Sequence, residues 1–266
     1  MPRDPLAETR DTMRDDLLDA QAALDWAVAQ IPMFQNAFLE WNKDPYELRK
    51  EFDSESGEHL IAAYLRVPLP LTFNAWAGAM INSLRSALDL LGAALARRNG
   101  KKPSTDTHFP IFRSEMDMID PLEGIERKKW LTKRQRAAIK SLKPYRGGDH
   151  TLWALHRMDV VRKHERLLST QPDISGYRFS FVEPDRVTLT WGGGGYLGAP
   201  RSENKSILHR SKRDFTFNPA QGHATITSFI TFNEIETLLP IVNQEVAPTI
   251  RRFAERVSEI IGVFDS

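Results

Sequence analysis

Apolar side chains recur at steps of three and four over the first hundred residues, a spacing that places them on one face of a helix. One stripe predicts a long helix from about residue 11 to Pro32, where the proline bends it, with an extension to Trp41. The strongest stripe predicts a helix that begins at Thr72 and ends at Asn99-Gly100. The N-terminal part of the chain is therefore expected to be mainly helical.

Shorter segments connect and follow these long helices. Asp44-Pro45-Tyr46-Glu47 has the cap, proline and glutamate of a helix start, and residues 59–67 have the pattern of a strand. A basic helix is predicted over residues 132–142, and Asp149 or Thr151 can cap the helix that comes after it.

The hydrophobic pattern changes to a period of two after Tyr177. Short alternating runs with turn residues between them predict the strands of an antiparallel sheet. These runs are 178–182, 186–191, 205–209, 214–217 and 223–232. Parallel strands would need helices of about a dozen residues between them, and the connections are too short for that.

The fold class that these elements indicate is α+β, with a helical bundle packed with an antiparallel β-sheet. Asn233 can open a C-terminal helix that ends near Gly262. There is no internal repeat and no low-complexity linker. We therefore expect a single α+β domain over residues 1–266, with residues 1–170 mainly helical and residues 171–266 forming the sheet and the C-terminal helix.

Composition narrows the class of protein without indicating a reaction. Of the 266 residues, 41% are hydrophobic, and none is cysteine, which excludes disulfides, thiolate zinc sites and a cysteine nucleophile. The histidines show no metal-ligand spacing, so we expect neither a metal nor a cofactor. Because no apolar run approaches the ~18 residues of a membrane span and the start has no apolar signal-peptide core, we expect a cytoplasmic protein without a membrane partner.

Charge is distributed unevenly, although the formal net charge is only +1. Residues 1–60 are acidic, whereas residues 127–146 are rich in Lys and Arg. One interpretation is a phosphate-binding face in which Lys129, Lys133 and Arg136 contact RNA or a nucleotide. The alternative is a solvated helix face that docks on the acidic N-terminal helix.

Two of the predicted helices carry polar residues inside apolar patterns, at positions i, i+3 and i+7 of one face. These residues are Asn82, Arg85 and Asp89 on the first helix and His156, Asp159 and Lys163 on the second, where His164 points about a quarter-turn away. Because an unpaired buried charge costs several kcal/mol, we expect the two faces to meet. Arg85 could then pair with Asp159. His156 or His164 could lie beside Asp89, either in a site or in a purely structural network.

The same stretches resemble a family of uncharacterised bacterial proteins. Residues 77–89, AGAMINSLRSALD, are similar to the family's GD-x-x-h-N-L-R-S-A-L-D-H stretch. Residues 142–149, LKPYRGGD, are similar to its L-K-P-Y-x-G-G stretch, and residues 155–164 to its L-h-x-L-x-x-x-D-K-H-R stretch. The likeness follows the order of the chain over roughly residues 10–170, and it implies no assigned activity.

The arginine and histidine spacing of that family, R-x-x-x-x-H, is similar to the motif of the HEPN superfamily, helical domains that include metal-independent RNases. The resemblance implies a helical bundle that binds RNA or a nucleotide, with arginine and histidine of a homodimer acting on the RNA. Arg85 matches the arginine, but Leu90 stands at the histidine position. Ala79 and Arg162 stand where the family has aspartates, so we expect a degenerate catalytic motif.

Three hypotheses for the function follow. The first is a HEPN-like protein that binds RNA or a nucleotide, and the second is a non-catalytic scaffold or interaction protein with a structural polar core. The third is a small-molecule enzyme in which Arg85, Asp89 and His164 carry the catalysis. The candidate binding residues are Asn82, His156, Asp159, Lys163, Lys129, Lys133 and Arg136.

Overall fold

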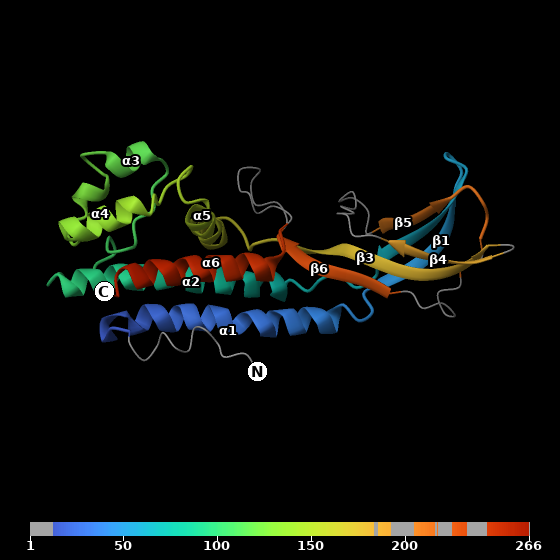
Figure 1. Ribbon diagram of the computed structural model, residues 1–266, viewed down its shortest axis with the longest axis horizontal. Coiled ribbons are helices and arrows are strands. Elements are labelled where there is room, and N and C mark those ends of the chain that lie inside the picture. Colours follow the sequence, from blue (N-terminus) through green and yellow to red (C-terminus); the bar gives the residue numbers. More distant parts are fainter. Residues whose placement is uncertain are drawn as a thin grey trace. The chain divides into compact units, whose positions relative to one another are not determined.

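The structure is a computed structural model that describes residues 13–183, 186–192, 205–215, 217, 225–232 and 244–265 (Figure 1). Its helices are η2 (Asp15–Leu17), α1 (Leu18–Trp41), α2 (Thr72–Arg98), α3 (Glu115–Ile119), η3 (Ile125–Arg127), α4 (Lys133–Ser141), α5 (His150–His164) and α6 (Val246–Val263). Its strands are β1 (Tyr46–Asp53), β2 (Glu58–Leu65), β3 (Thr170–Glu183), β4 (Arg186–Gly192), β5 (Lys205–Ser211) and β6 (Thr225–Phe232).

The chain divides into two compact units, and each is assembled from separate segments of the sequence. The helical unit contains α1 as far as Phe34, the segment from Thr72 to Ser169, and α6. The strand unit contains the rest of α1 and strands β1 to β6, apart from the last residue of β6. The β1–β2 hairpin therefore belongs to the strand unit, although it lies within residues 1–170.

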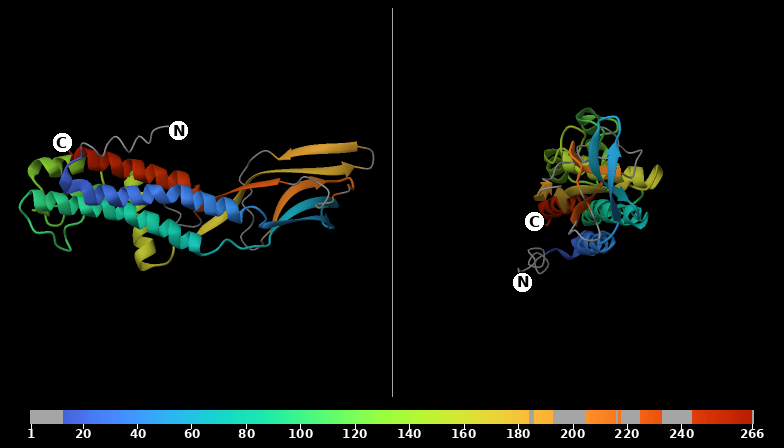
Figure 2. Two further views of the ribbon diagram at one scale, coloured as in Figure 1. Left: turned by 90° about the horizontal axis from the view of Figure 1, so that it is seen from below. Right: turned by 90° about the vertical axis from the view of Figure 1, so that its right-hand side faces the viewer.

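Helices α1, α2 and α6 run alongside one another in the helical unit, and α5 crosses them (Figures 1 and 2). Helices α1 and α2 are antiparallel, since Trp76 Nε1 donates to Gln30 while Ser83 Oγ donates to the carbonyl of Ala23. Leu88 of α2 is 0% exposed, as its place in the apolar stripe predicts.

Helix α2 has nearly the bounds that the pattern predicts, whereas α1 begins at Leu18, after η2, rather than near residue 11. Helix α1 continues through Pro32 to Trp41, and α2 begins at Thr72 and ends at Arg98. The mixed α+β class is confirmed. Within the described residues, no helix is both long enough and apolar enough to span a membrane.

Capping side chains define the starts of the two helices that follow the long loop. The Thr132 hydroxyl accepts a hydrogen bond from Gln135 N at 3.2 Å, and the Gln135 side chain accepts one from Thr132 N at 2.8 Å, so α4 starts with a capping box. The Asp149 carboxylate accepts from Leu152 N at 2.9 Å and caps α5. The turn between them needs Gly147, whose φ of 90° other residues avoid.

The strand unit contains two three-stranded sheets, in which β2 lies between β1 and β5, and β3 lies between β4 and β6. The pairs β1–β2, β2–β5 and β3–β4 are antiparallel. Between β3 and β6, Ser175 bonds to the carbonyl of Thr227 and Thr231 bonds to that of Gln171. Residue numbers thus rise on one strand as they fall on the other, which is the antiparallel order that the sequence predicts.

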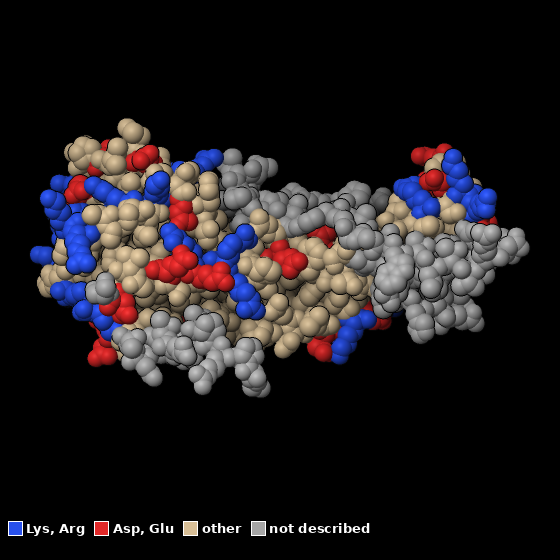
Figure 3. Space-filling view, in the orientation of Figure 1, with Lys and Arg blue, Asp and Glu red and all other residues tan. Residues whose placement is uncertain are grey.

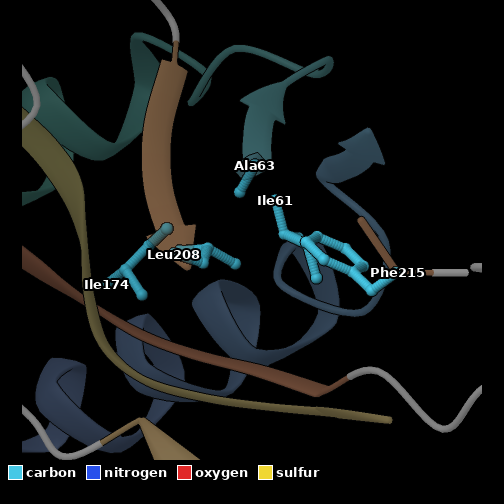
Figure 4. Close-up of a cluster of buried hydrophobic side chains, with 5 residues drawn as sticks. All are labelled: Ile61, Ala63, Ile174, Leu208 and Phe215. Atoms are coloured by element: carbon cyan, nitrogen blue, oxygen red, sulfur yellow. The ribbon is translucent and has the colours of Figure 1, made fainter. Parts of the chain in front are cut away.

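The core of the strand unit lies between these two sheets (Figure 4). Ile174 of β3 packs with Ile61 and Ala63 of β2, and Leu208 of β5 and Phe215 complete the cluster. Each of these side chains is at most 4% exposed. Burial of this cluster contributes roughly 25 cal/mol for every Å² of apolar surface removed from water.

The segment 44–47 does not begin a helix, so this prediction is wrong. It leads into β1, every residue of which pairs with β2 in one continuous antiparallel register. Tyr46 and Leu48 pack against the core cluster, whereas the intervening Glu47 forms an ion pair with Arg49 at 2.8 Å. Burial of alternate side chains against the facing sheet outweighs the local capping signal, which stabilises a helix by about 1 kcal/mol.

The strand predicted over residues 214–217 is also wrong, because Asp214 and Phe215 follow β5 outside any strand. Phe215 looked like a strand residue because it is apolar, and its side chain is indeed buried in the core cluster. The predicted helix start at Asn233 lies outside the described residues. The end of the C-terminal helix at Val263 matches the prediction.

Candidate functional site

Arg85 lies at the centre of a polar network on α2, with only 4% of its surface exposed. Its guanidinium donates to Asp89 Oδ1 at 2.6 Å and to the carbonyl of Phe109 at 3.0 Å. The same Asp89 oxygen accepts from Phe109 N at 3.0 Å. The Arg85–Asp89 pair therefore holds both backbone polar groups of Phe109 and ties the loop before α3 to α2.

Gly92 makes this close approach of the loop possible. A Cβ atom at Gly92 would lie 3.1 Å from Phe109 N and 3.2 Å from the carbonyl carbon of His108, so any side chain would push the loop away. A glycine inside a helical pattern is a signal of such close packing.

Asp159 of α5 is 3% exposed and lies beside one amide donor and two cations. Asn82 Nδ2 donates to its Oδ1 at 3.1 Å, and Lys163 Nζ lies 2.6 Å from its Oδ2. Arg162 Nε lies 3.5 Å from Oδ1, and its side chain passes over Gly78 of α2, where a Cβ atom would be only 2.8 Å from Arg162 Cδ. Cations and an amide thus surround this buried carboxyl group, as the burial of a polar group requires.

His156 lies beside this network as a neutral ring. Burial, and after it the positive charge of Arg85, lower its pKa to about 4, and Asp159 only partly opposes them. Its Nδ1 atom is buried and has no hydrogen-bond partner in the part of the chain that the structure describes. The imidazole therefore carries no charge at neutral pH and contacts the ring of Trp153 at a centroid distance of 5.8 Å.

The expectation that the two polar helix faces meet is confirmed by the Asn82–Asp159 hydrogen bond. The pairing of Arg85 with Asp159 is wrong, because Arg85 takes Asp89 and a backbone carbonyl instead. His164 is exposed at the last residue of α5 and makes no hydrogen bond or ion pair with Arg85 or Asp89 among the described contacts. The sequence interpretation missed the Phe109 backbone, which carries no side-chain signal.

A second candidate is a basic surface where the end of α2 and the start of α4 come together. We call it the basic end, and its exposed residues are Arg97, Lys101, Lys102, Lys129, Lys133 and Arg134. Asn99 Nδ2 donates to the carbonyl of Trp130 at 2.9 Å and to Gln135 Oε1 at 2.7 Å, which joins the two segments. Figure 3 shows Lys and Arg side chains gathered over this end of the helical unit, at the left of the view.

The cations near the basic end differ in whether an acidic group already binds them. Arg136 and Lys140 share Glu126, at 3.0 Å and 2.6 Å, and these cations lower the pKa of that carboxyl, with the Lys140 hydrogen bond the largest cause. Arg136 also donates to the carbonyl of Leu131 at 2.6 Å, so it has little capacity left for a phosphate. Among the described residues, the six cations of the basic end have no acidic partner at ion-pair distance.

No group of three or more metal-ligating side chains occurs among the described residues. Comparison with protein-family models, with curated proteins and with solved structures found no match.

Proposed function

We propose that this protein binds single-stranded RNA through the basic end and does not cleave it. The observation that carries the proposal is the gathering of six exposed cations, from two segments joined by Asn99, with no acidic partner among the described residues. Exposed Lys and Arg attract phosphates because their binding releases the counterions condensed on the nucleic acid.

The paired state of the polar network supports a structural role for it rather than a catalytic one. Arg85 donates hydrogen bonds to Asp89 and to the Phe109 carbonyl, and Asp159 accepts one from Asn82 and forms an ion pair with Lys163. Leu90 occupies the position where the HEPN motif has histidine, and Leu cannot move a proton. The HEPN likeness is therefore proposed for the helical architecture and RNA binding alone, and the homodimer stays a prediction.

The test is fluorescence anisotropy with a labelled single-stranded RNA of 20 nucleotides at several salt concentrations. Neutralising Lys129, Lys133 and Arg134 to Gln should reduce the magnitude of the salt slope by about 0.7 for each lost contact, or about 2 in all. A charge-matched control variant neutralises Lys212, Arg213 and Arg251, which are exposed elsewhere. It should keep the original slope.

No measurable binding at ~50 mM salt, where phosphate contacts act strongly, would overturn the RNA proposal and leave the scaffold hypothesis. Robust RNA cleavage that His164→Ala abolishes would overturn the non-catalytic part and favour an enzyme that uses Arg85, Asp89 and His164.

A further inference from the structure

A shallow pocket opens at the basic end, between the first turns of α4 and the ends of α2 and α6. Three of its lining residues are apolar, and four are polar or charged: Ala138, Val263 and Phe264, and Thr132, Gln135, Arg98 and Arg134. Val263 is 44% exposed, so part of this apolar lining faces water in a pocket that Arg98 and Arg134 also line.

Hydrogen bonds to backbone and acidic groups hold the pocket walls in place. Arg98 donates to both carboxylate oxygens of Asp16, at 2.8 Å and 3.0 Å, and to the carbonyl of Phe264 at 2.8 Å. Gln135 is held by Asn99 and by the capping box. Arg134 is exposed and has no acidic partner in the described part of the chain, so its guanidinium is available to a ligand.

An apolar floor beside an available guanidinium suits a flat, aromatic and partly polar group. Nucleobases stack on apolar or aromatic side chains and on guanidinium planes, and this contact is tolerant of base identity. The neighbouring Lys133 and Arg97 can hold the phosphates on either side of such a base. We propose that the pocket takes one base of the bound RNA strand, an inference that rests on the RNA binding proposed above.

Two probes separate base recognition from charge attraction: a labelled oligouridine of 12 nucleotides, and inorganic polyphosphate, which has the charge but no bases. Ala138→Phe fills the pocket and should weaken oligouridine binding about tenfold, the loss expected for one stacked base, while polyphosphate binding stays unchanged. The matched control is Ala137→Phe, because Ala137 is exposed on α4 next to the pocket but does not line it. It should leave the binding of both probes unchanged.

If Ala138→Phe does not fold, Val263→Asn serves instead, because its partly exposed position tolerates a polar side chain and the change removes apolar surface from the pocket without altering its charge. If a folded pocket variant bound both probes equally less tightly, or bound both as before, the proposal that the pocket takes a base would be wrong. If the unaltered protein bound neither probe, the proposed RNA function would itself be wrong. If the unaltered protein bound both probes but the pocket variant showed no selective loss of oligouridine binding, only the proposal of a base pocket would be wrong.

Discussion

At the scale of single residues, Arg85 shows how a buried charge becomes part of the fold. Its two nitrogen atoms bond to a carboxylate one turn away and to a carbonyl 24 residues away in the chain. Taking a guanidinium out of water costs several kcal/mol, and these two hydrogen bonds help to offset this cost. The residue therefore determines where the loop that carries Phe109 lies on α2.

Arg85→Ala should lower the free energy of unfolding by about 3 kcal/mol, the low end for a buried pair, because the Phe109 carbonyl would lose its donor while Asp89 is partly exposed to water. Urea denaturation followed by circular dichroism measures this. The control is Arg97→Ala, at an exposed position of the same helix. A loss no larger than that of the control would contradict the structural role of Arg85.

At the scale of elements, α5 attaches to α2 through a polar contact as well as through apolar packing. Asn82 and Asp159 join the helices directly, and Arg162 lies in the space left by Gly78. His156 shares this face and is buried in its neutral form. Protonation of that ring places a second positive charge beside Arg85, so the attachment of α5 depends on pH.

The pKa of His156 is lowered from 6.5 to about 4, so the folded state binds its proton less readily than the unfolded state. The contribution of neutral His156 to the free energy of unfolding is complete above pH 6.5. It falls as the pH drops toward 4, by about 2 kcal/mol at pH 5. His156→Gln should remove this loss, whereas His164→Gln, at an exposed position, should not. Unfolding free energies at pH 7, 6 and 5 measure the effect, and an unchanged pH slope in His156→Gln would show that the ring does not carry it.

At the scale of the whole molecule, the two units interleave along the chain. The helical unit takes its last helix, α6, from the C-terminal end, after the strands of the other unit. Ile250, Phe253, Val257 and Ile260 of α6 are at most 1% exposed. Neither unit is therefore a continuous segment that could be separated by a single cut.

A fragment of residues 1–169 should lack a cooperative unfolding transition, although it contains α1 to α5. Loss of α6 removes several large buried side chains, each contributing about 1.5–3 kcal/mol, against a typical total stability of 5–15 kcal/mol. Near-ultraviolet circular dichroism and a thermal melt, compared with the full chain, provide the measurement. A sharp two-state thermal melt of the fragment, together with the near-ultraviolet signals of ordered aromatic side chains, would contradict this prediction.

Much of the helical architecture could be predicted because its signals are local. The bounds of α2, the capping box of α4 and the Asp149 cap of α5 depend on residues within one or two turns. The polar faces that carry Asn82 and Asp159 were correctly expected to meet, since both interrupt apolar stripes, but the expected partner of Asp159 was Arg85 rather than Asn82. The sequence could not predict that Arg136 forms an ion pair with Glu126 while Lys129 and Lys133 do not, because this depends on where Glu126 lies in the fold.

The sequence by itself determined the α+β class, the long helices and the antiparallel order of the strands, because hydrophobic periodicity and turn chemistry act over short distances. Only the tertiary structure decided that residues 46–53 form a strand, that Arg85 bonds to Phe109, and that the basic end encloses a pocket. Each of these depends on a neighbour distant in the chain, such as the facing sheet, a backbone loop or α6. A backbone carbonyl gives no side-chain signal of its own, and a glycine such as Gly92 indicates a close approach without showing which segment makes it.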